Sequence, residues 1–578
     1  MAHLQSKTLF FVTSPRSPMK MQPEISLLVS QFNGKPWNPS TQIQFIRALA
    51  QDPNFEGTGS PSDMAFSARD RINRGPKAFG FVDISPTVQL TEAGANFIDG
   101  ELAEEALLRQ LLKFQLPSPF HRETSRNVGL FYVKPYLEIF RLIDKLGTVT
   151  FDEIMIFGMQ LTRYNKFDEI VNKIYKFRAA KNRHNGSYKN FMGEYRDKEI
   201  FKIYEEEILS GNTRTRESRD ASVQKFIKTK AGNLRDYTDA CFRYLRATGL
   251  VSISQKGRSL SILPEKMEEV HYFLNHIDRR PCFVDDEARY KAYLFDSQLP
   301  VLYTDNRDNL EKELAMLTDI SVGEIASTST EDLKKELMKA IQNRKDRIIR
   351  DQIQQLKAFK NYTDIINVFT DIKDNNFYDV PLMLEWNTWR AMTMLDGGNI
   401  KANLKFDDNG QPMSTASGNI ADIVCDYGDF NLSVEVTMST GQRQYEMEGE
   451  PVSRHLAKLK REQGKEAFCF FIAPKINESC IAHFYTLHRT NIAFYGGKSV
   501  IIPIELEVFE KMIEQSSNVS YVPDSNQVKQ FCEYSMKTAN EANDENEWYQ
   551  SIRNKALNWL TGAFPEDAER LFKVAESK

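Results

Sequence analysis

Hydrophobic and polar residues alternate over positions 432–437, and this alternation predicts a β-strand with Glu435 on its polar face. A second apolar run, residues 423–425, follows Asp422 directly. The residues between the two runs, 426–429, contain the Gly and Asp that are typical of a tight turn. The pattern therefore predicts a β-hairpin that brings Asp422 and Glu435 close together at the surface of a sheet.

Farther along the chain, the spacing of apolar residues changes from that of a strand to that of a helix. A helix is predicted to begin near Pro451, which suits a first helical turn, and His455 lies beside its apolar stripe. The helix could therefore turn His455 toward the two carboxylates. Residues 467–472 predict a fully buried strand, and the runs 491–495 and 499–504 predict that the sheet continues. The order strand, turn, strand, helix, strand indicates a mixed sheet.

The first 283 residues show the pattern of a winged-helix module twice, each time as a helix with a short β-ribbon after it. A helix predicted over 65–72 precedes a ribbon within 79–90, and a helix over 237–249 precedes a hairpin with Lys256 and Arg258 at its tip. Such helices and tips commonly contact DNA phosphates, although solvated basic faces and ordinary surface turns have the same composition. The cations predicted to bind DNA on this basis are Arg69, Arg71, Arg74, Lys77, Lys256 and Arg258.

Residues 284–375 have a different character. Thr330 opens a long amphipathic helix with one apolar stripe and charges of both signs on its other faces. No glycine-rich stretch interrupts this region, which indicates a fairly stiff helical connector. The predicted domains are two DNA-recognition subdomains (1–125 and 126–283), a helical linker (284–375) and a mixed-sheet α/β domain (376–578) that carries the carboxylates.

Composition narrows the class of protein without identifying it. The 578 residues include 75 basic and 79 acidic side chains, so a DNA-binding protein with this net charge of −4 has to concentrate its positive charge locally. The six cysteines lack CxxC spacing, so neither a zinc ribbon nor a disulfide framework is expected, and a reducing cytoplasm is the predicted location. No apolar run suggests a membrane span, and no GxxxxGK[ST] motif supports ATP-driven translocation.

Converging carboxylates have a specific chemical meaning. Two such groups repel each other, so they usually need a shared proton or a cation. Mg²⁺ accepts a few hard oxygen ligands, and it could polarise a phosphodiester and acidify an attacking water. Glu385, on a predicted helix, is a candidate third carboxylate. The alternative is that Asp422 and Glu435 are ordinary hairpin residues facing solvent, Glu385 a helix-surface residue and His455 a half-buried one.

A set of short motifs is specific in combination, although each is weak alone. They are Ser14–Pro18, Gln22–Glu24, Phe66–Arg71, Leu111–Gln115, Glu385-Trp386, Asp422, Glu435-Val-Thr437, Glu448, Glu450-Pro-Val452, Arg454-His455 and Phe470–Pro474. Together they resemble the AlwI-like type IIS restriction endonucleases, a family that includes site-specific nicking enzymes. The resemblance covers most of the chain. It implies that the C-terminal domain is a variant of the PD-(D/E)xK nuclease fold.

Carried over position by position, the resemblance implies roles for individual residues. The implied catalytic residues are Glu385, Asp422, Glu435, Glu448 and His455; the metal-binding residues are Asp422, Glu435 and Val436; and Arg16 joins the predicted DNA-binding cations. Two departures from the broad superfamily matter, because Ala421 stands where it has Pro and Thr437 where it has Lys. The missing Lys leaves the general base open between His455 and a metal-bound water.

These expectations describe a multidomain α+β protein with winged-helix-like recognition subdomains, a helical linker and a PD-(D/E)xK-like nuclease domain. The predicted activity is that of a type IIS-like endonuclease, which recognises a short asymmetric duplex sequence and hydrolyses phosphodiesters a few base pairs downstream with Mg²⁺ as cofactor. The expected partners are double-stranded DNA, a second copy or a small catalytic subunit for double-strand cleavage, and a cognate DNA methyltransferase in the host. Two alternatives remain: nicking of one strand only, and a non-catalytic winged-helix DNA-binding regulator.

Overall fold

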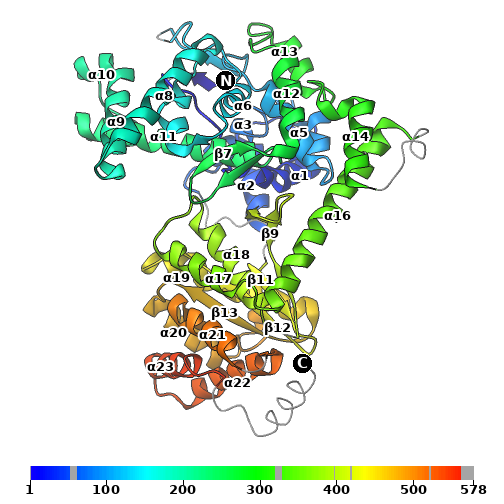
Figure 1. The fold of residues 1–578 in the computed structure, drawn as a ribbon, viewed down its shortest axis with the longest axis vertical. Helices are drawn as coiled ribbons and strands as arrows, with labels where there is room; N and C mark the ends of the chain where they lie inside the picture. The colour runs from blue at the N-terminus through cyan, green and yellow to red at the C-terminus, as the bar shows by residue number, and fades with distance from the viewer. Residues whose placement is uncertain are drawn as a thin grey trace. The chain divides into compact units, whose positions relative to one another are not determined.

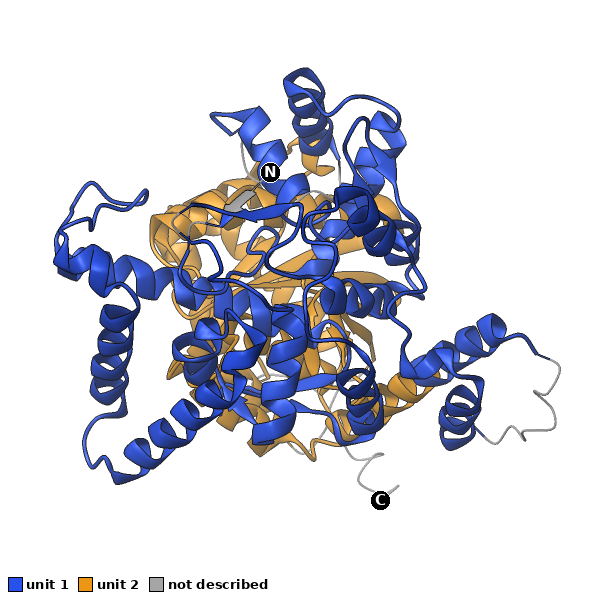
Figure 2. Ribbon diagram, turned by 90° about the horizontal axis from the view of Figure 1, so that it is seen from above, with its two compact units in different colours: residues 1–52, 59–342 blue, residues 53–58, 343–578 orange. Residues whose placement is uncertain are grey.

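The computed structural model describes residues 2–4, 6–52, 61–125, 127–318, 328–395, 397–416, 420–519 and 522–560. The chain forms two compact units (Figure 2). Unit 1 consists of residues 1–52 and 59–342, and unit 2 of residues 53–58 and 343–578. Their boundary falls inside a helix of the predicted linker, and the four domains drawn from the sequence stay predictions. Both units contain helices and strands, so the mixed α+β class is confirmed.

Unit 1 is mainly helical (Figure 1). Its helices are α1 (Met21–Phe32), α2 (Pro39–Gln51), α3 (Met64–Arg74), α4 (Glu92–Ile98), α5 (Ala103–Lys113), α6 (Pro135–Leu146), α7 (Phe151–Ile156), α8 (Phe167–Arg183), α9 (Tyr188–Ile203), α10 (Glu205–Leu209), α11 (Val223–Arg246), α12 (Met267–His276), α13 (Glu287–Phe295), α14 (Arg307–Leu317) and the start of α16 (Thr330–Lys357). Its strands are β1 (Ala2–Leu4), β2 (Val82–Asp83), β3 (Gln89–Leu90), β4 (His121–Glu123), β5 (Val149–Thr150), β6 (Val251–Ser254) and β7 (Ser259–Ile262). These strands form small sheets, the largest with the order β5-β7-β6.

The helix-plus-ribbon elements predicted in this unit form largely where expected. Helix α3 covers the predicted 65–72, and β6 and β7 pair as an antiparallel hairpin with Lys256 and Arg258 in its connection. Helix α11 differs from the prediction, because it begins at Val223 rather than at residue 237. The Ser222 side chain caps its first turn, and buried residues such as Phe226 and Leu234 extend the apolar stripe toward that earlier start.

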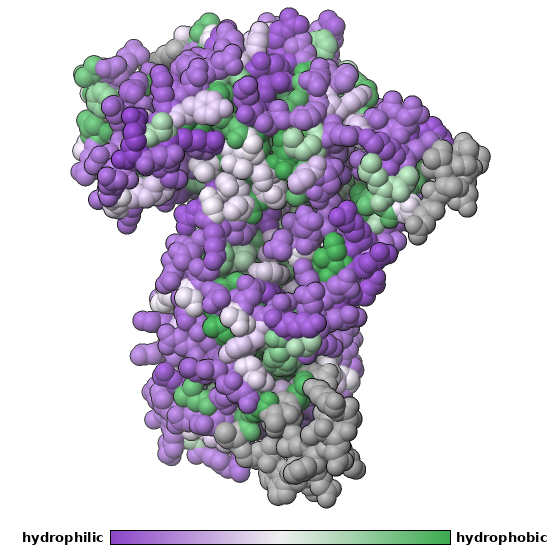
Figure 3. Space-filling view, in the orientation of Figure 1, coloured by the Kyte–Doolittle hydropathy of each residue, from purple (hydrophilic) through white to green (hydrophobic). Residues whose placement is uncertain are grey.

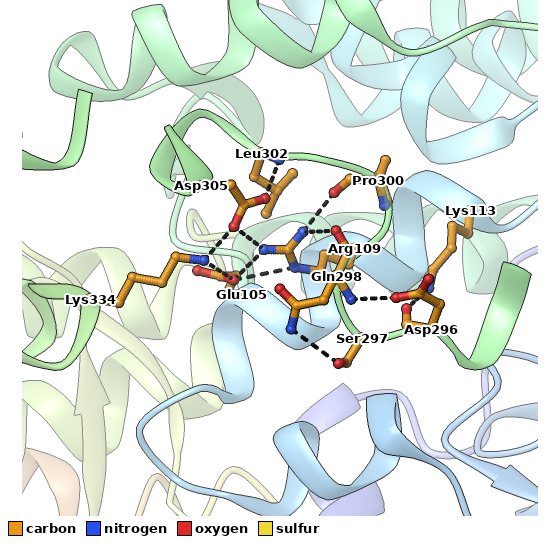
Figure 4. A network of polar contacts seen from close by, with 10 residues as sticks. All are labelled: Glu105, Arg109, Lys113, Asp296, Ser297, Gln298, Pro300, Leu302, Asp305 and Lys334. Atoms are coloured by element: carbon orange, nitrogen blue, oxygen red, sulfur yellow. Dashed lines mark hydrogen bonds and ion pairs between the residues drawn. The ribbon is translucent and has the colours of Figure 1, made fainter. Parts of the chain in front are cut away.

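A buried polar network joins α5 to the segment that precedes α14 (Figure 4). Arg109, 3% exposed, donates hydrogen bonds to the carbonyl oxygens of Gln298 at 2.9 Å and Pro300 at 2.7 Å. It also forms ion pairs with Glu105 and Asp305, and Lys334 of α16 binds the same two carboxylates. Two cations and two carboxylates neutralise each other here, which allows Arg109 to be buried and the other three charges to be partly buried.

Unit 2 is built on a five-stranded mixed sheet with the order β14-β13-β12-β11-β8. Its strands are β8 (Asn399–Ala402), β9 (Leu404–Phe406), β10 (Pro412–Thr415), β11 (Ile423–Asp426), β12 (Phe430–Val436), β13 (Glu466–Ala473) and β14 (Ile501–Glu505). Its helices after α16 are α17 (Tyr362–Lys373), α18 (Val380–Thr393), α19 (Gln442–Gln463), α20 (Glu478–Arg489), α21 (Leu506–Asn518), α22 (Ser525–Glu541) and α23 (Glu545–Ala556). Strands β12, β13 and β14 run parallel, whereas β11 is antiparallel to both β12 and β8.

The middle of this sheet is buried on both faces. Strand β13 has seven consecutive buried residues after Glu466, as the apolar run predicted, and α19 forms the crossover between the parallel strands β12 and β13. Two predictions for this region are wrong. The helix begins at Gln442 rather than near Pro451, which lies in its interior, and residues 493–495 form a 3₁₀ turn rather than a strand. Proline at an interior position removes one helical N–H, a loss that the packed helix tolerates here.

Helix α16 is the long helix that the sequence predicts from Thr330, and its residues belong to both units. In unit 1, its Leu333 and Leu337 pack against buried leucines of α14. In unit 2, its Lys345 forms an ion pair with Asp408 at 2.9 Å, and Leu356 joins the hydrophobic core. The apolar stripe of the sequence thus has a packing partner at both ends of the helix.

The surface of the described residues is mainly polar. The face shown in Figure 3 is mostly hydrophilic, with hydrophobic side chains in small separate groups. Within the described ranges, no helix combines the length and the apolar character that crossing a lipid bilayer requires.

Burial of His488 makes the stability of unit 2 depend on pH. His488 on α20 is 4% exposed, its Nε2–H donates to the carbonyl of Ile501 at 2.9 Å, and burial lowers its pKa to about 4. An unfolded histidine has a pKa of about 6.5. As the pH falls from 6.5 to 4, the unfolded chain therefore binds a proton that the folded chain does not, and the unfolding free energy falls by on the order of 3 kcal/mol.

We expect His488→Gln to reduce this acid sensitivity. Urea unfolding between pH 4 and 7.5, followed by tryptophan fluorescence, is suited to the test because four of the five tryptophans lie in unit 2. The exposed His184 supplies the matched control, His184→Gln, which should keep the wild-type pH dependence. A His488→Gln protein whose stability falls with acid as steeply as that of the wild type would contradict the prediction.

Candidate active site

The hairpin of β11 and β12 brings the two predicted carboxylates together. Ile423 pairs with Val434, so the same register extended by one residue places Asp422 opposite Glu435. Asp422 Oδ2 accepts a hydrogen bond from the backbone N–H of Val436 at 2.9 Å, and the Glu435 carboxylate accepts one from the backbone N–H of Asp422. Each carboxylate is therefore held by the backbone of the opposite strand. The turn has the expected form, because Gly428 has a φ of 90°.

Helix α19 turns His455 toward this pair. His455 Nδ1 lies 2.8 Å from Glu435 Oε1, and both side chains are mostly buried, with exposed fractions of 15% and 8%. When Glu435 is ionised, the imidazole proton is on Nδ1, and this N–H donates a hydrogen bond to the carboxylate oxygen. The hydrogen bond fixes the orientation of the ring. The helix therefore turns His455 toward the carboxylates, as its position beside the apolar stripe predicts, although the helix starts earlier than expected.

Two more of the predicted carboxylates reach the same place. Glu385, from α18, accepts a hydrogen bond from the Thr415 hydroxyl at 3.2 Å, and the charges of Asp422 and Glu435 both act on it. Glu448, from α19, is hydrogen-bonded by the hydroxyl of Thr437. We call Glu385, Asp422, Glu435, Glu448 and His455 the carboxylate cluster. Its members come from two helices of unit 2, from β12 and from the residue directly before β11.

Burial and mutual repulsion make ionisation of this cluster unfavourable. Burial raises the pKa of Glu385 well above its usual value, and the charge of Asp422 raises it further. Burial likewise raises the pKa of Glu435 well above its usual value, with the charge of Glu448 adding to the effect. The pKa of Glu448 is raised by burial, while Thr437 and His455 act in the opposite direction. A proton or a cation would relieve this repulsion. Glu435 is buried and Asp422 is partly buried, so neither is the solvent-facing hairpin residue of the alternative interpretation.

The donor set of the cluster fits a hard divalent cation. Asp422 and Glu435 offer carboxylate oxygens from adjacent positions, and such oxygens together with water are what Mg²⁺ prefers. Among the described residues, no three or more Asp, Glu, His or Cys side chains form a ready-made metal site. The backbone N–H of Val436 binds Asp422, and the metal contact expected of Val436 stays a prediction.

Thr415 is a site residue that the sequence did not suggest. It lies 30 positions from Glu385 on β10, and no spacing pattern connects a strand residue to a helix residue over that distance. In sequence, Thr437 stands out only as a replacement for Lys, whereas its hydroxyl binds Glu448. Both threonines give carboxylates of the cluster a hydrogen-bond donor without a positive charge.

Most of the predicted DNA-binding cations have partners within unit 1. Arg16 pairs with Asp236 and Asp239, Arg69 donates to Gln42, Arg71 pairs with the buried Glu24, Arg74 pairs with Asp70, and Lys77 lies over the ring of Phe120. Lys77 is also largely buried, and burial lowers its pKa. Each of these residues therefore has a structural contact in addition to any contact with DNA.

Lys256 and Arg258 stand out by their exposure and by their position in a hairpin connection. Both are exposed in the connection between β6 and β7, and Arg258 has a φ of 47°, in the left-handed region. A hairpin tip with two exposed cations has the form of a wing that can reach a phosphate backbone.

Comparison with known proteins bears on the whole chain. No curated protein matches it. Among solved structures, the small subunit (R.BspD6I2) of the heterodimeric restriction endonuclease R.BspD6I is 25% identical, with a TM-score of 0.28 over 34% of this chain and 96% of the other. The BpuJ1 endonuclease binding domain, in complex with modified DNA, is 14% identical, with a TM-score of 0.32 over 50% of this chain and 95% of the other.

The model of one protein family, the AlwI restriction endonuclease, matches residues 78–512. This range makes up most of the chain and includes the entire carboxylate cluster together with the β6–β7 hairpin. The match agrees with the motifs that resemble the same family. The chain belongs to the AlwI restriction endonuclease family.

Proposed function

We propose that this protein is a Mg²⁺-dependent, type IIS-like endonuclease whose active site is the carboxylate cluster of unit 2. The observation that carries the proposal is the convergence of Asp422 and Glu435 on adjacent strands, with three further ionisable groups around them. Membership in a restriction endonuclease family supports hydrolysis of DNA. The mixed sheet, with an acidic hairpin and a crossover helix, supports a PD-(D/E)xK-like domain.

Each member of the cluster has a proposed role. Asp422 and Glu435 hold the metal, which when bound supplies charge neutralisation for the phosphodiester and acidifies a water. His455 holds Glu435 in position through Nδ1, and its Nε2 serves as the proton acceptor that the missing Lys would otherwise provide. Glu385 and Glu448 assist from the two flanking helices, each oriented by a threonine hydroxyl.

Recognition is proposed to lie in unit 1. The two helix-plus-ribbon regions act as winged-helix-like modules, in which a helix reads base edges and the wing contacts phosphates. Lys256 and Arg258 are the best placed of the predicted cations for such a phosphate contact, because both are exposed at a hairpin tip. Cleavage at a distance of a few base pairs would then follow from separating recognition and hydrolysis between two units.

The number of strands cut depends on how many active sites meet one DNA duplex. The described residues provide one carboxylate cluster per chain, so one chain is expected to hydrolyse one strand. A double-strand break would require a second copy of the chain or a small catalytic subunit. A host that carries the enzyme would need a cognate DNA methyltransferase to protect its own sites.

Sequencing the ends of a plasmid digested with and without Mg²⁺ gives the recognition site, the distance from it to the cut and the number of strands cut. An intact plasmid would contradict the proposal.

We expect Glu435→Gln to abolish cleavage while leaving DNA binding nearly unchanged. Loss of residues that only support metal ligands costs about 10–100-fold in activity, so loss of a ligand should cost more than about 100-fold. Plasmid cleavage in Mg²⁺ and a gel-shift assay measure the two properties separately. The matched control is Glu462→Gln, an exposed position on α19, which should cleave normally. Cleavage by the Glu435→Gln protein at the wild-type rate would rule out this site.

The same variant should be more stable than the wild type when no divalent ion is present. Gln removes a buried negative charge next to Glu448, so the unfolding free energy at pH 8 should rise by about 1–3 kcal/mol. Adding Mg²⁺ should raise the melting temperature of the wild type but not that of the variant. Thermal unfolding in EDTA and in Mg²⁺ measures both effects, and a wild-type protein whose melting temperature ignores Mg²⁺ would count against a metal in this cluster.

For recognition, we expect Lys256→Ala with Arg258→Ala to weaken DNA binding and to reduce its salt dependence. Each lost phosphate contact lowers the slope of log affinity against log salt concentration by about 0.9, so the double variant should lose nearly two units of slope. Fluorescence anisotropy with duplex DNA over a range of salt concentrations measures the slope. Lys145→Ala with Lys339→Ala, two exposed cations elsewhere in unit 1, is the control and should keep it. An unchanged slope in the hairpin variant would mean that the tip does not touch DNA.

A further inference from the structure

A cavity with distinctive chemistry lies in unit 1 and is lined by residues of that unit. It has a volume of about 800 Å³, within the range of sites that hold small organic molecules. Aromatic side chains line it from several directions, namely Tyr132, Tyr272, Phe283 and Tyr293. The ring of Tyr272 stacks on that of His276 with centroids 4.2 Å apart, which fixes one wall as a flat surface.

Lys134 in the wall of this cavity is a cation without a partner. The residue is 3% exposed, and within the described residues its ammonium forms neither a hydrogen bond nor an ion pair. Burial lowers its pKa, and the neighbouring Cys282 and Asp278 offset this effect only in part. Asp278 itself is bound by Arg280 at 2.6 Å, so its carboxylate is already neutralised. No carboxylate or carbonyl group of the described residues binds this ammonium directly, so an anion in the cavity would be its closest counter-ion.

The position of Lys134 adds to the positive potential of the cavity. Lys134 is the residue that precedes the twelve-residue helix α6, whose first helical residue is Pro135. The amino-terminal end of a helix carries a partial positive charge, which acts in the same direction as the ammonium. The helix end therefore adds to the positive potential around Lys134, although of the two only Lys134 lines the cavity.

We propose that this cavity binds a nucleotide, with its phosphate on Lys134 and its base against the aromatic rings. A lysine ammonium binds phosphate as a point charge, and aromatic side chains stack on every kind of base. An aromatic-lined cavity with one uncompensated cation fits a ligand that is planar at one end and anionic at the other. The nucleotide can be a free one or one that belongs to a DNA strand, since both present the same chemistry.

Cys282 provides a reporter for occupancy of this cavity. It lines the cavity, and it is partly exposed, whereas the other five cysteines of the chain are buried. Its position is set by Gln115, which accepts a hydrogen bond from the Cys282 backbone N–H at 2.9 Å and donates one to its carbonyl oxygen at 2.6 Å. A maleimide should therefore modify Cys282 selectively in the folded protein, and a bound nucleotide should shield it.

The test measures the rate of Cys282 modification by N-ethylmaleimide, followed by peptide mass spectrometry, with the full chain in EDTA so that cleavage plays no part. At a dAMP concentration of about four times its dissociation constant, we expect modification to slow about fivefold. The protection should be lost in Lys134→Met and retained in Lys145→Met, an exposed position at the other end of α6. Inorganic phosphate should protect less than dAMP, because it lacks the base.

A duplex oligonucleotide identifies the source of the nucleotide. Protection by dAMP but not by the duplex assigns the site to a free nucleotide, and protection by both assigns it to a nucleotide that DNA can also present. Equal protection by phosphate and dAMP overturns the stacking role of the aromatic wall, and absence of protection by dAMP overturns the proposal. Because EDTA blocks metal-dependent cleavage, these outcomes do not depend on whether unit 2 is the nuclease.

Thermal stability separates a binding lysine from a structural one. Lys134 has no partner to lose, so Lys134→Met should melt at or above the temperature of the wild type in the absence of nucleotide. A markedly lower melting temperature would mean that the ammonium stabilises the fold and would overturn the proposal. If the variant does not fold, equilibrium dialysis of the wild type against labelled dAMP decides, since a protein that retains no dAMP has no such site.

Discussion

The site in unit 2 depends on a reciprocal exchange of hydrogen bonds across the β11–β12 hairpin. The backbone N–H of Val436 binds the Asp422 carboxylate, and the backbone N–H of Asp422 binds that of Glu435. Without these bonds the two acidic groups would separate, because burial and repulsion both oppose their ionisation. Apolar burial in the sheet offsets the free-energy cost of these carboxylates, because β12 and β13 lie in the middle of a core that is buried on both faces. A strongly apolar sheet thus supports electrostatically unfavourable carboxylates near the end of its central strand, β12.

The hairpin could be predicted from the sequence because its information is local. Alternation around Glu435 defines the face, the turn at Asp426–Asp429 defines the register, and the register places Asp422 opposite Glu435. The position of His455 also followed from helical periodicity. The start of α19 did not, because the expectation that proline marks a first turn gave way to tertiary packing along the helix. The hydrogen bond from Thr415 to Glu385 cannot be predicted from local sequence patterns, because it depends on how β10 packs against α18.

Charge patterns in unit 1 are less informative for a physical reason. A basic residue on a helix face has the same appearance in sequence whether it binds a phosphate or a carboxylate of its own chain. Arg71 illustrates the second case, as its partner Glu24 is 5% exposed and would be left unpaired without it. The motif Leu111–Gln115 is similar: the buried Lys113 donates to carbonyl oxygens at the end of α13, and Gln115 holds Cys282. These family-like motifs therefore maintain the fold of unit 1.

Helix α19 supplies two of the five groups in the carboxylate cluster, and their spacing explains why it can. Glu448 and His455 are seven residues apart, so they lie on the same face two turns from each other. His455 binds Glu435, and Glu448 is bound by Thr437 two positions further along from that glutamate. The helix therefore contacts the strand at two successive inward positions of the same face. A shift of the helix by one residue would break both contacts at once, which makes the register between α19 and β12 the second constraint on the geometry of the site.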